Sequence, residues 1–86
     1  MSIWIANYEG NEIRIENSWR GEKLYVNNKL QEARSGLTSS AKLTGHLISK
    51  NGEKKPIKVN LGGNFRMKCY LFVDDEQVEV IKEAIV

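Results

Sequence analysis

Apolar and polar side chains alternate along much of this chain, and the clearest run lies near its C-terminal end. From residue 65 onward, every second position is apolar. Successive side chains of a β-strand point to opposite faces, whereas a helix needs apolar spacings of three and four. The run therefore predicts a half-buried strand over 65–73. Its inward residues, which we expect to lead the core, are Phe65, Met67, Cys69, Leu71 and Val73.

Shorter runs with the same two-residue period recur along the rest of the chain. Polar or charged residues fill most of the positions between the apolar ones, which is typical of sheets with one buried face. The apolar positions, in chain order, are Ile3 and Ile5; Ile13 and Ile15; Leu24 and Val26; Ala41, Leu43, Gly45 and Leu47; and Ile57, Val59 and Leu61.

The C-terminal segment fits two structures. Val78 and Val80 continue the alternation of the preceding strand. Val78, Ile81 and Ile85 also fit one face of a helix that would begin behind an Asp75 cap. We expect a strand over 77–81 followed by a frayed or partly helical tail, which brings the total to seven or eight strands.

Residues that favour tight turns separate these runs. They are Gly10, Asn27-Asn28, Asn51-Gly52, Gly62-Gly63 and Asp74-Asp75. Gly, Asn and Asp adopt positive φ more readily than other residues, and two-residue β-hairpin turns require positive φ. Short connections of this kind join antiparallel neighbours. The sequence therefore predicts an all-β fold, an antiparallel β-sandwich of seven or eight strands joined by hairpins, with residues 1–86 as a single domain.

Cysteine content and hydropathy indicate the cellular compartment in which this domain works. Cys69 is the single cysteine, so no internal disulfide can form, which is typical of proteins from reducing compartments. The N-terminus lacks the basic and apolar regions of a signal peptide, and no apolar run approaches the roughly 18 residues of a membrane-spanning helix. We expect a cytoplasmic protein with no membrane partner.

Residue types that carry catalysis or bind metals are sparse. His46 is the only histidine, and the alternation places it outward, whereas Cys69 faces inward. These two side chains are therefore not expected to pair as nucleophile and base, and a Cys/His metal cluster lacks ligands. Asp74, Asp75 and Glu76 lack the ligand spacing of a calcium loop and are expected to form a solvated hairpin tip. We predict no catalytic residue, no metal and no cofactor, so the chain is predicted not to be an enzyme.

The outward positions of the 65–73 strand form a candidate interaction face that consists of Arg66, Lys68, Tyr70 and Phe72. Cations that alternate with aromatic rings on a sheet are typical of surfaces on which single-stranded nucleic acids stack. The same pattern fits an ordinary strand whose aromatic side chains pack under a loop while its charges are solvated. The net charge of +2 does not by itself indicate a nucleic-acid binder.

Trp19 and Ile48 are two further candidates for an interaction surface. Trp19 lies in a turn, where it either caps one end of the sandwich or anchors a partner. Ile48, together with Tyr70, Phe72 and Ile81, would form an exposed apolar patch, which favours self-association or a protein partner.

Five segments follow one another in an order that resembles that of a known family. They are 11–16 (NEIRIE), followed by a glycine-containing turn; 23–29 (KLYVNNK); 41–45 (AKLTG); 57–59 (IKV); and 70–75 (YLFVDD). On these segments the chain resembles the β-sandwich domain of the Fas apoptosis inhibitory molecule family. The resemblance implies an eight-stranded, non-enzymatic sandwich that acts through protein contacts and has no catalytic motif. Residues 37–40 and the basic loop before Pro56 depart from this pattern, and an uncharacterised bacterial domain family of the same architecture is the alternative.

Three classes of function follow from these observations. The leading hypothesis is a non-catalytic domain that acts by protein–protein interaction or self-association. The alternative is single-stranded nucleic-acid binding through the basic and aromatic sheet face, with help from Lys54, Lys55 and Lys58. A third class is a carrier that holds a small molecule between its sheets. The inward positions named above are all apolar, so none of them offers a polar group to such a ligand.

Overall fold

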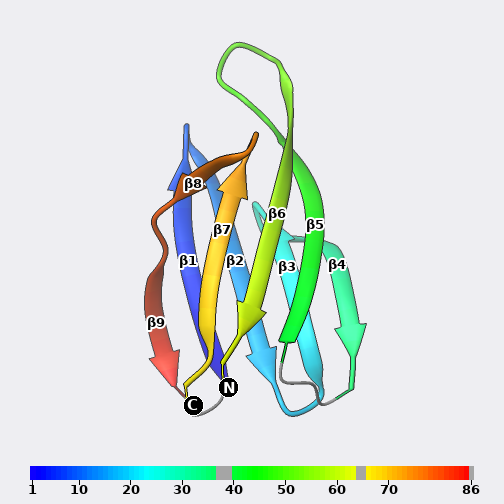
Figure 1. The fold of residues 1–86 in the computed structure, drawn as a ribbon. Coiled ribbons are helices and arrows are strands. Elements are labelled where there is room, and N and C mark those ends of the chain that lie inside the picture. Colours follow the sequence, from blue (N-terminus) through cyan, green and yellow to red (C-terminus); the bar gives the residue numbers. More distant parts are fainter. Residues whose placement is uncertain (37–39, 64–65, 86) are drawn as a thin grey trace.

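A computed structural model describes residues 1–36, 40–63 and 66–85 of this chain. These residues form nine β-strands and no helix (Figure 1). The strands are β1 (Ser2–Tyr8), β2 (Asn11–Ser18), β3 (Gly21–Val26), β4 (Lys29–Ser35), β5 (Ser40–Ile48), β6 (Lys54–Gly62), β7 (Lys68–Val73), β8 (Glu76–Val78) and β9 (Ile81–Ile85).

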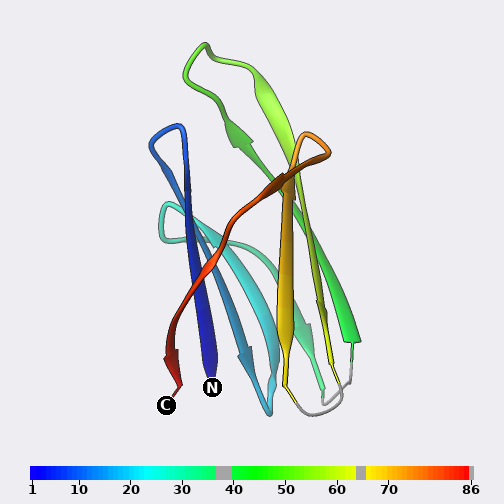
Figure 2. The ribbon, with the colours of Figure 1, turned by 60° about the vertical axis from the view of Figure 1, so that its left-hand side comes forward.

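The strands form two antiparallel sheets, which lie as two layers in Figures 1 and 2. The large sheet has five strands in the order β4-β3-β2-β1-β9, and the small sheet has four in the order β5-β6-β7-β8. Neighbours in sequence pair through short turns, and the chain changes sheet between β4 and β5 and again between β8 and β9. The prediction of an all-β antiparallel fold is confirmed, and the described residues form nine strands rather than seven or eight.

Inward side chains from both sheets meet in one hydrophobic cluster. Each sheet turns one face toward this cluster and the other toward solvent, which produces the two-residue period of the sequence. The largest fully buried side chains are Ile13, Ile15, Leu24, Leu43, Ile57, Val59, Leu71 and Val73.

The predicted core segment at 65–73 is buried only in its second half. Leu71 and Val73 are fully buried, whereas Met67 and Cys69 are half-buried at the margin of the cluster. Phe65 lies outside the described residues. Strand β7 begins only after Met67, so the alternation starts before the sheet does.

The inward face of β1 differs from the alternation of the sequence. Trp4 and Ala6 point into the core, and Ile3 and Ile5 lie on the outward face, where they are half-buried. The prediction that Ile3 and Ile5 mark the core face is therefore wrong. Both faces of this strand are apolar, so the pattern alone leaves the choice of face open.

Strand β4 has no counterpart in the sequence prediction. Its residues are mainly polar, and its leucine, Leu30, is exposed. A strand at the edge of a sheet can form with few buried side chains because its neighbour supplies the backbone pairing, here β3. The apolar period is therefore absent from this segment.

Side chains of β4 also bind the backbone of β5, which is an edge strand of the small sheet. A free strand edge presents N–H and C=O groups that need partners. We call this contact the β4–β5 junction, and it joins the two sheets on one side of the molecule. Its hydrogen bonds run from the Thr44 N–H to Glu32 Oε1 (2.6 Å), from the His46 N–H to Gln31 Oε1 (3.2 Å) and from Arg34 Nη1 to the Lys42 carbonyl oxygen (2.9 Å).

The C-terminal segment divides between the two sheets. Glu76–Val78 forms β8 in the small sheet, and Ile81–Ile85 forms β9 beside β1 in the large sheet. The predicted strand over 77–81 is thus interrupted, and the helical tail is wrong for the described residues. Val78 and Val80 both pack against the core, since the crossing chain keeps facing the same cluster.

Four of the five predicted turns occur at their expected positions, with one difference in geometry. The fifth, Gly62-Gly63, differs, because Gly62 is the last residue of β6 and the connection after Gly63 includes residues 64–65, which lie outside the described residues. Both central residues have positive φ at Glu9-Gly10, Asn27-Asn28 and Asp74-Asp75, as type I′ hairpins require. At Asn51-Gly52 only Gly52 does. That longer loop is organised by Ser49, whose N–H donates to the Glu53 carbonyl oxygen and whose carbonyl oxygen accepts from the Gly52 N–H.

Candidate functional site

The outward face of the small sheet brings most of the candidate residues together. Lys68, Tyr70 and Phe72 project from β7, and Arg66 lies exposed in the connection just before it. Neighbouring strands contribute the remaining positions through their register. The two central rows are Lys42–Asn60–Tyr70 and Thr44–Lys58–Phe72–Gln77.

Charge is divided unevenly between the two sheets. Strands β5 to β8 carry five lysines against a single acid, Glu76, whereas the strands of the large sheet carry five basic and five acidic residues. One of the five lysines, Lys55, faces inward and donates to the Tyr8 hydroxyl at 3.0 Å. We call the outward surface the basic face and define it by the side chains of Lys42, Lys54, Lys58, Lys68, Tyr70 and Phe72.

The two aromatic rings of the basic face differ in exposure. Tyr70 is 45% exposed and lies in the row of Lys42, two residues from Lys68 along β7. Phe72 is half-buried and lies directly opposite Lys58 on β6. Tyr70 is therefore the more accessible of the two rings.

Acidic side chains are confined to one end of this face. Asp74 and Asp75 form the β7–β8 turn, Glu76 begins β8, and all three are exposed, so the predicted solvated hairpin tip is confirmed. Lys58 Nζ lies 3.3 Å from Asp75 Oδ1, and both side chains are largely exposed. An exposed pair of this kind contributes little to stability and leaves the lysine able to exchange partners.

The two other candidates lie apart from the centre of the basic face. Ile48 is exposed at the end of β5, opposite Lys54. Trp19 lies in the β2–β3 turn of the large sheet and is 73% exposed, so it does not cap the end of the fold as one of the two hypotheses held. Arg20 lies over its ring, with the guanidinium carbon 4.9 Å from the ring centroid. Ile81 is exposed on β9 in the large sheet, so the predicted apolar patch does not lie on one sheet face.

Cys69 and His46 lie on opposite faces of the small sheet. Cys69 is half-buried beside the core, and burial raises the pKa of its thiol to about 12. His46 is exposed on the outward side of β5, opposite Pro56. The thiol therefore remains protonated at neutral pH, and the two residues do not form a nucleophile–base pair.

Within the described ranges, no group of three or more His, Cys, Asp or Glu side chains could hold a metal ion. The same part of the chain contains no helix that is long and apolar enough to cross a membrane.

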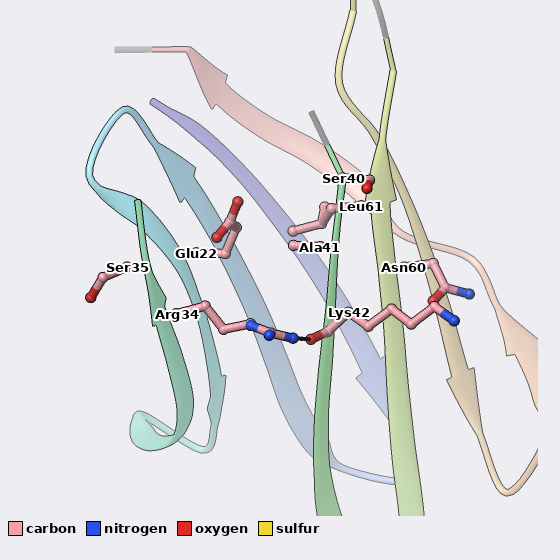
Figure 3. A pocket seen from close by; sticks show the side chains of 8 residues that line it. All are labelled: Glu22, Arg34, Ser35, Ser40, Ala41, Lys42, Asn60 and Leu61. Atoms are coloured by element: carbon pink, nitrogen blue, oxygen red, sulfur yellow. Dashed lines mark hydrogen bonds between the residues drawn. The ribbon is translucent and has the colours of Figure 1, made fainter. Parts of the chain in front are cut away.

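Glu22, a buried carboxyl residue, is absent from the candidates that the sequence pattern predicted. Glu22 on β3 is 2% exposed and lines a pocket of about 580 Å³ between the edges of the two sheets (Figure 3). The signal was present, because Glu22 continues the inward positions of Leu24 and Val26 by one step. A carboxyl group at an inward position predicts either a buried polar network or a site.

Comparisons with known proteins do not assign a family or a function to this chain. The family resemblance given above remains a prediction. No protein-family model, no curated protein and no solved structure matches this chain significantly.

Proposed function

We propose that this chain is a non-catalytic β-sandwich domain that binds single-stranded nucleic acid through the basic face. The observation that carries the proposal is the concentration of lysines around the exposed Tyr70 ring on one sheet, while the other sheet is neutral. Such a surface offers phosphates their counter-charges and offers a base a stacking partner. We place the domain in the cytoplasm, where its free cysteine fits a reducing environment.

The spacing of the side chains supports this mode of binding. Outward residues on one strand lie about 7 Å apart, and neighbouring strands lie about 4.8 Å apart. A base stacked on Tyr70 would thus have Lys68 along the same strand and Lys42 two strands away in the same row. No acid occupies an outward position in the middle of this face on the described strands.

The protein-partner hypothesis is supported less directly. It draws on exposed apolar residues, and these are dispersed over the β2–β3 turn, β4, the end of β5 and β9. Partner-binding surfaces usually form a contiguous apolar patch with an aromatic anchor at the centre. An acidic protein segment could compete with nucleic acid for the lysines, so the test below includes an acidic polypeptide as a competitor.

Binding of a fluorescein-labelled oligothymidylate, measured by fluorescence anisotropy at low salt, tests the proposal. We expect saturable binding that weakens as salt rises, with a slope of log K against log[salt] near −3 if four lysines contact phosphates, at about 0.7 per contact. Tyr70→Ser should lower the affinity about tenfold, because stacking of one base on an aromatic ring contributes roughly 1–3 kcal/mol. Lys68→Glu should weaken binding further and flatten the salt dependence.

Lys29→Glu on β4 is the matched control, because it makes the same charge change at an exposed lysine of the large sheet. It should bind the oligonucleotide about as tightly as the parent protein. Equal losses from Lys29→Glu and Lys68→Glu would show that only net charge matters and would contradict the proposal. So would the absence of binding at low salt, or complete displacement by polyglutamate at an equal concentration of charge.

Self-association through β9 is a second candidate, favoured by one observation. This strand is an edge of the large sheet, and Ile81 at its start is 69% exposed. An edge strand of this kind can add a strand from another molecule. Light scattering over a concentration series tests the idea. A mass that rises above that of the monomer in the parent, and stays monomeric in Ile81→Lys, supports it, and a constant monomer mass in both removes it.

A further inference from the structure

The pocket beside Glu22 lies at the end of the molecule where β3 and β4 of the large sheet face β5 and β6 of the small one (Figure 3). Its walls combine apolar and polar groups. The lining residues are Glu22, Arg34, Ser35, Ser40, Ala41, Lys42, Asn60 and Leu61. Its volume of about 580 Å³ falls within the range of pockets that hold small organic molecules.

The carboxyl group of Glu22 is the unusual feature of this pocket. Glu22 is 2% exposed, and its Oε2 atom has no hydrogen-bond partner among the described residues. Its Oε1 atom has only a long contact, 3.5 Å from Asn17 Nδ2. A buried carboxyl oxygen without a partner is costly, and native structures usually supply one. A donor that enters the pocket would supply this partner.

Arg34 lines the same pocket and is the register partner of Glu22 on the neighbouring strand β4. Arg34 Nη1 donates to the Lys42 carbonyl oxygen at 2.9 Å, which holds the side chain across the space between β4 and β5 (Figure 3). This hydrogen bond uses one of the five N–H donors of the guanidinium. The charge of Arg34 also acts on Glu22, where it opposes the rise in the carboxyl pKa that burial causes. The pocket thus presents a buried acceptor and, beside it, an exposed cation that is held by a hydrogen bond.

We propose that this pocket binds a small zwitterion of amino-acid size, with its ammonium group donating to Glu22 and its carboxylate facing Arg34. A purely anionic ligand would meet the Glu22 carboxylate, and a purely cationic one would meet Arg34. A ligand without an N–H or O–H donor would leave Oε2 unpaired. Ala41 and Leu61 provide an apolar wall for an aliphatic side chain. This inference is independent of nucleic-acid binding by the basic face.

Titration of the ¹⁵N-labelled protein with L-leucine, followed by amide chemical shifts, tests the proposal. Leucinamide lacks the carboxylate and N-acetyl-leucine lacks the ammonium group, so the three probes separate the two charges. We expect saturable shifts with L-leucine at amides of β3, β4 and β5, and at least tenfold weaker binding of the other two probes. Glu22→Gln should abolish the leucine effect, and Arg34→Gln should weaken it.

Glu12→Gln is the matched control, because Glu12 is an exposed residue of β2 outside the pocket. It should bind leucine as the parent does. The fold of each variant is checked from its amide spectrum, and Glu22→Gln should remain folded because it removes a buried charge. Two results would overturn the proposal: no saturable shift with any probe, which would mean that water alone serves Oε2, or unchanged leucine binding by a folded Glu22→Gln variant.

Discussion

Replacement of Gly21 by alanine is expected to remove a large part of the unfolding free energy of this protein. Gly21 has a φ of 141° and is buried where β3 begins beside β4. A Cβ atom at this position would overlap the carbonyl oxygen of Arg34 and would lie 3.0 Å from the Cα of Ser35. These are backbone atoms of β4, so the clash can be relieved only by moving the strand.

The expected loss is about 2–6 kcal/mol of unfolding free energy. Backbone strain contributes roughly 1–3 kcal/mol, and forcing extra volume into a packed site contributes roughly 1–3 kcal/mol more. Domains of this size have only about 5–15 kcal/mol in total. Urea denaturation followed by tryptophan fluorescence and circular dichroism measures the loss.

Gly52→Ala provides the comparison for this variant. Gly52 also has positive φ, 84°, but a Cβ atom added there would meet no atom within 4 Å beyond its chain neighbours. It should lose only the conformational cost, about 1–2 kcal/mol. If the two variants lose the same free energy, the close approach of β3 and β4 does not govern the stability of this region.

Glu22→Gln is expected to stabilise the protein at neutral pH. Burial raises the pKa of the Glu22 carboxyl above its ordinary value of 4.5, and the charge of Arg34 only partly offsets this. An unpaired buried charge costs roughly 1–3 kcal/mol or more. Its removal should therefore raise the melting temperature by about 4–8 °C for each kcal/mol recovered.

The pH dependence provides a second readout for the same residue. Between pH 4.5 and the raised pKa, the folded state binds the Glu22 proton more often than the unfolded state does. The contribution of this group to stability therefore falls as pH rises through that window and stays at its lowest above it. The difference in melting temperature between Glu22→Gln and the parent should shrink as pH falls toward 4.5. In Glu12→Gln no such convergence is expected. A lower melting temperature of Glu22→Gln at pH 7 would show instead that attraction to Arg34 outweighs burial.

Most of the fold was predictable because one physical rule governs it. Seven of the nine strands contain an apolar run with a two-residue period or continue one, and three of the turns have the positive-φ residues that hairpins require. The two-residue period did not predict the correct structure in strands where burial does not alternate from one residue to the next. Strand β4 is a polar edge strand, and β1 is apolar on both faces.

The division of the C-terminal segment between two sheets could not be predicted from the sequence, for a different reason. Val78 and Val80 face the same core although the chain leaves the small sheet between β8 and β9. Periodicity reports which way a side chain points relative to the core, and it does not report which sheet the strand joins. When a strand pairs with a new sheet but keeps the same side chains turned toward the core, the apolar period of the sequence does not change.

The candidate face was predictable on its own strand and unpredictable across strands. Lys68, Tyr70 and Phe72 share a face by parity alone. The approach of Lys42 and Lys58 depends on the register between β5, β6 and β7, which long-range pairing decides. Glu22 was within reach of the parity argument, but its pocket depends on how the ends of the two sheets meet.

The β4–β5 junction has a consequence for aggregation. Exposed strand edges are sites at which unrelated molecules join by backbone pairing, and many proteins protect them with proline, bulges or charges. Here the outer edge of β5 is occupied by side chains of Gln31, Glu32 and Arg34 from the same chain. Resistance to fibril formation at this edge therefore depends on three substitutable side chains and not on the course of the backbone.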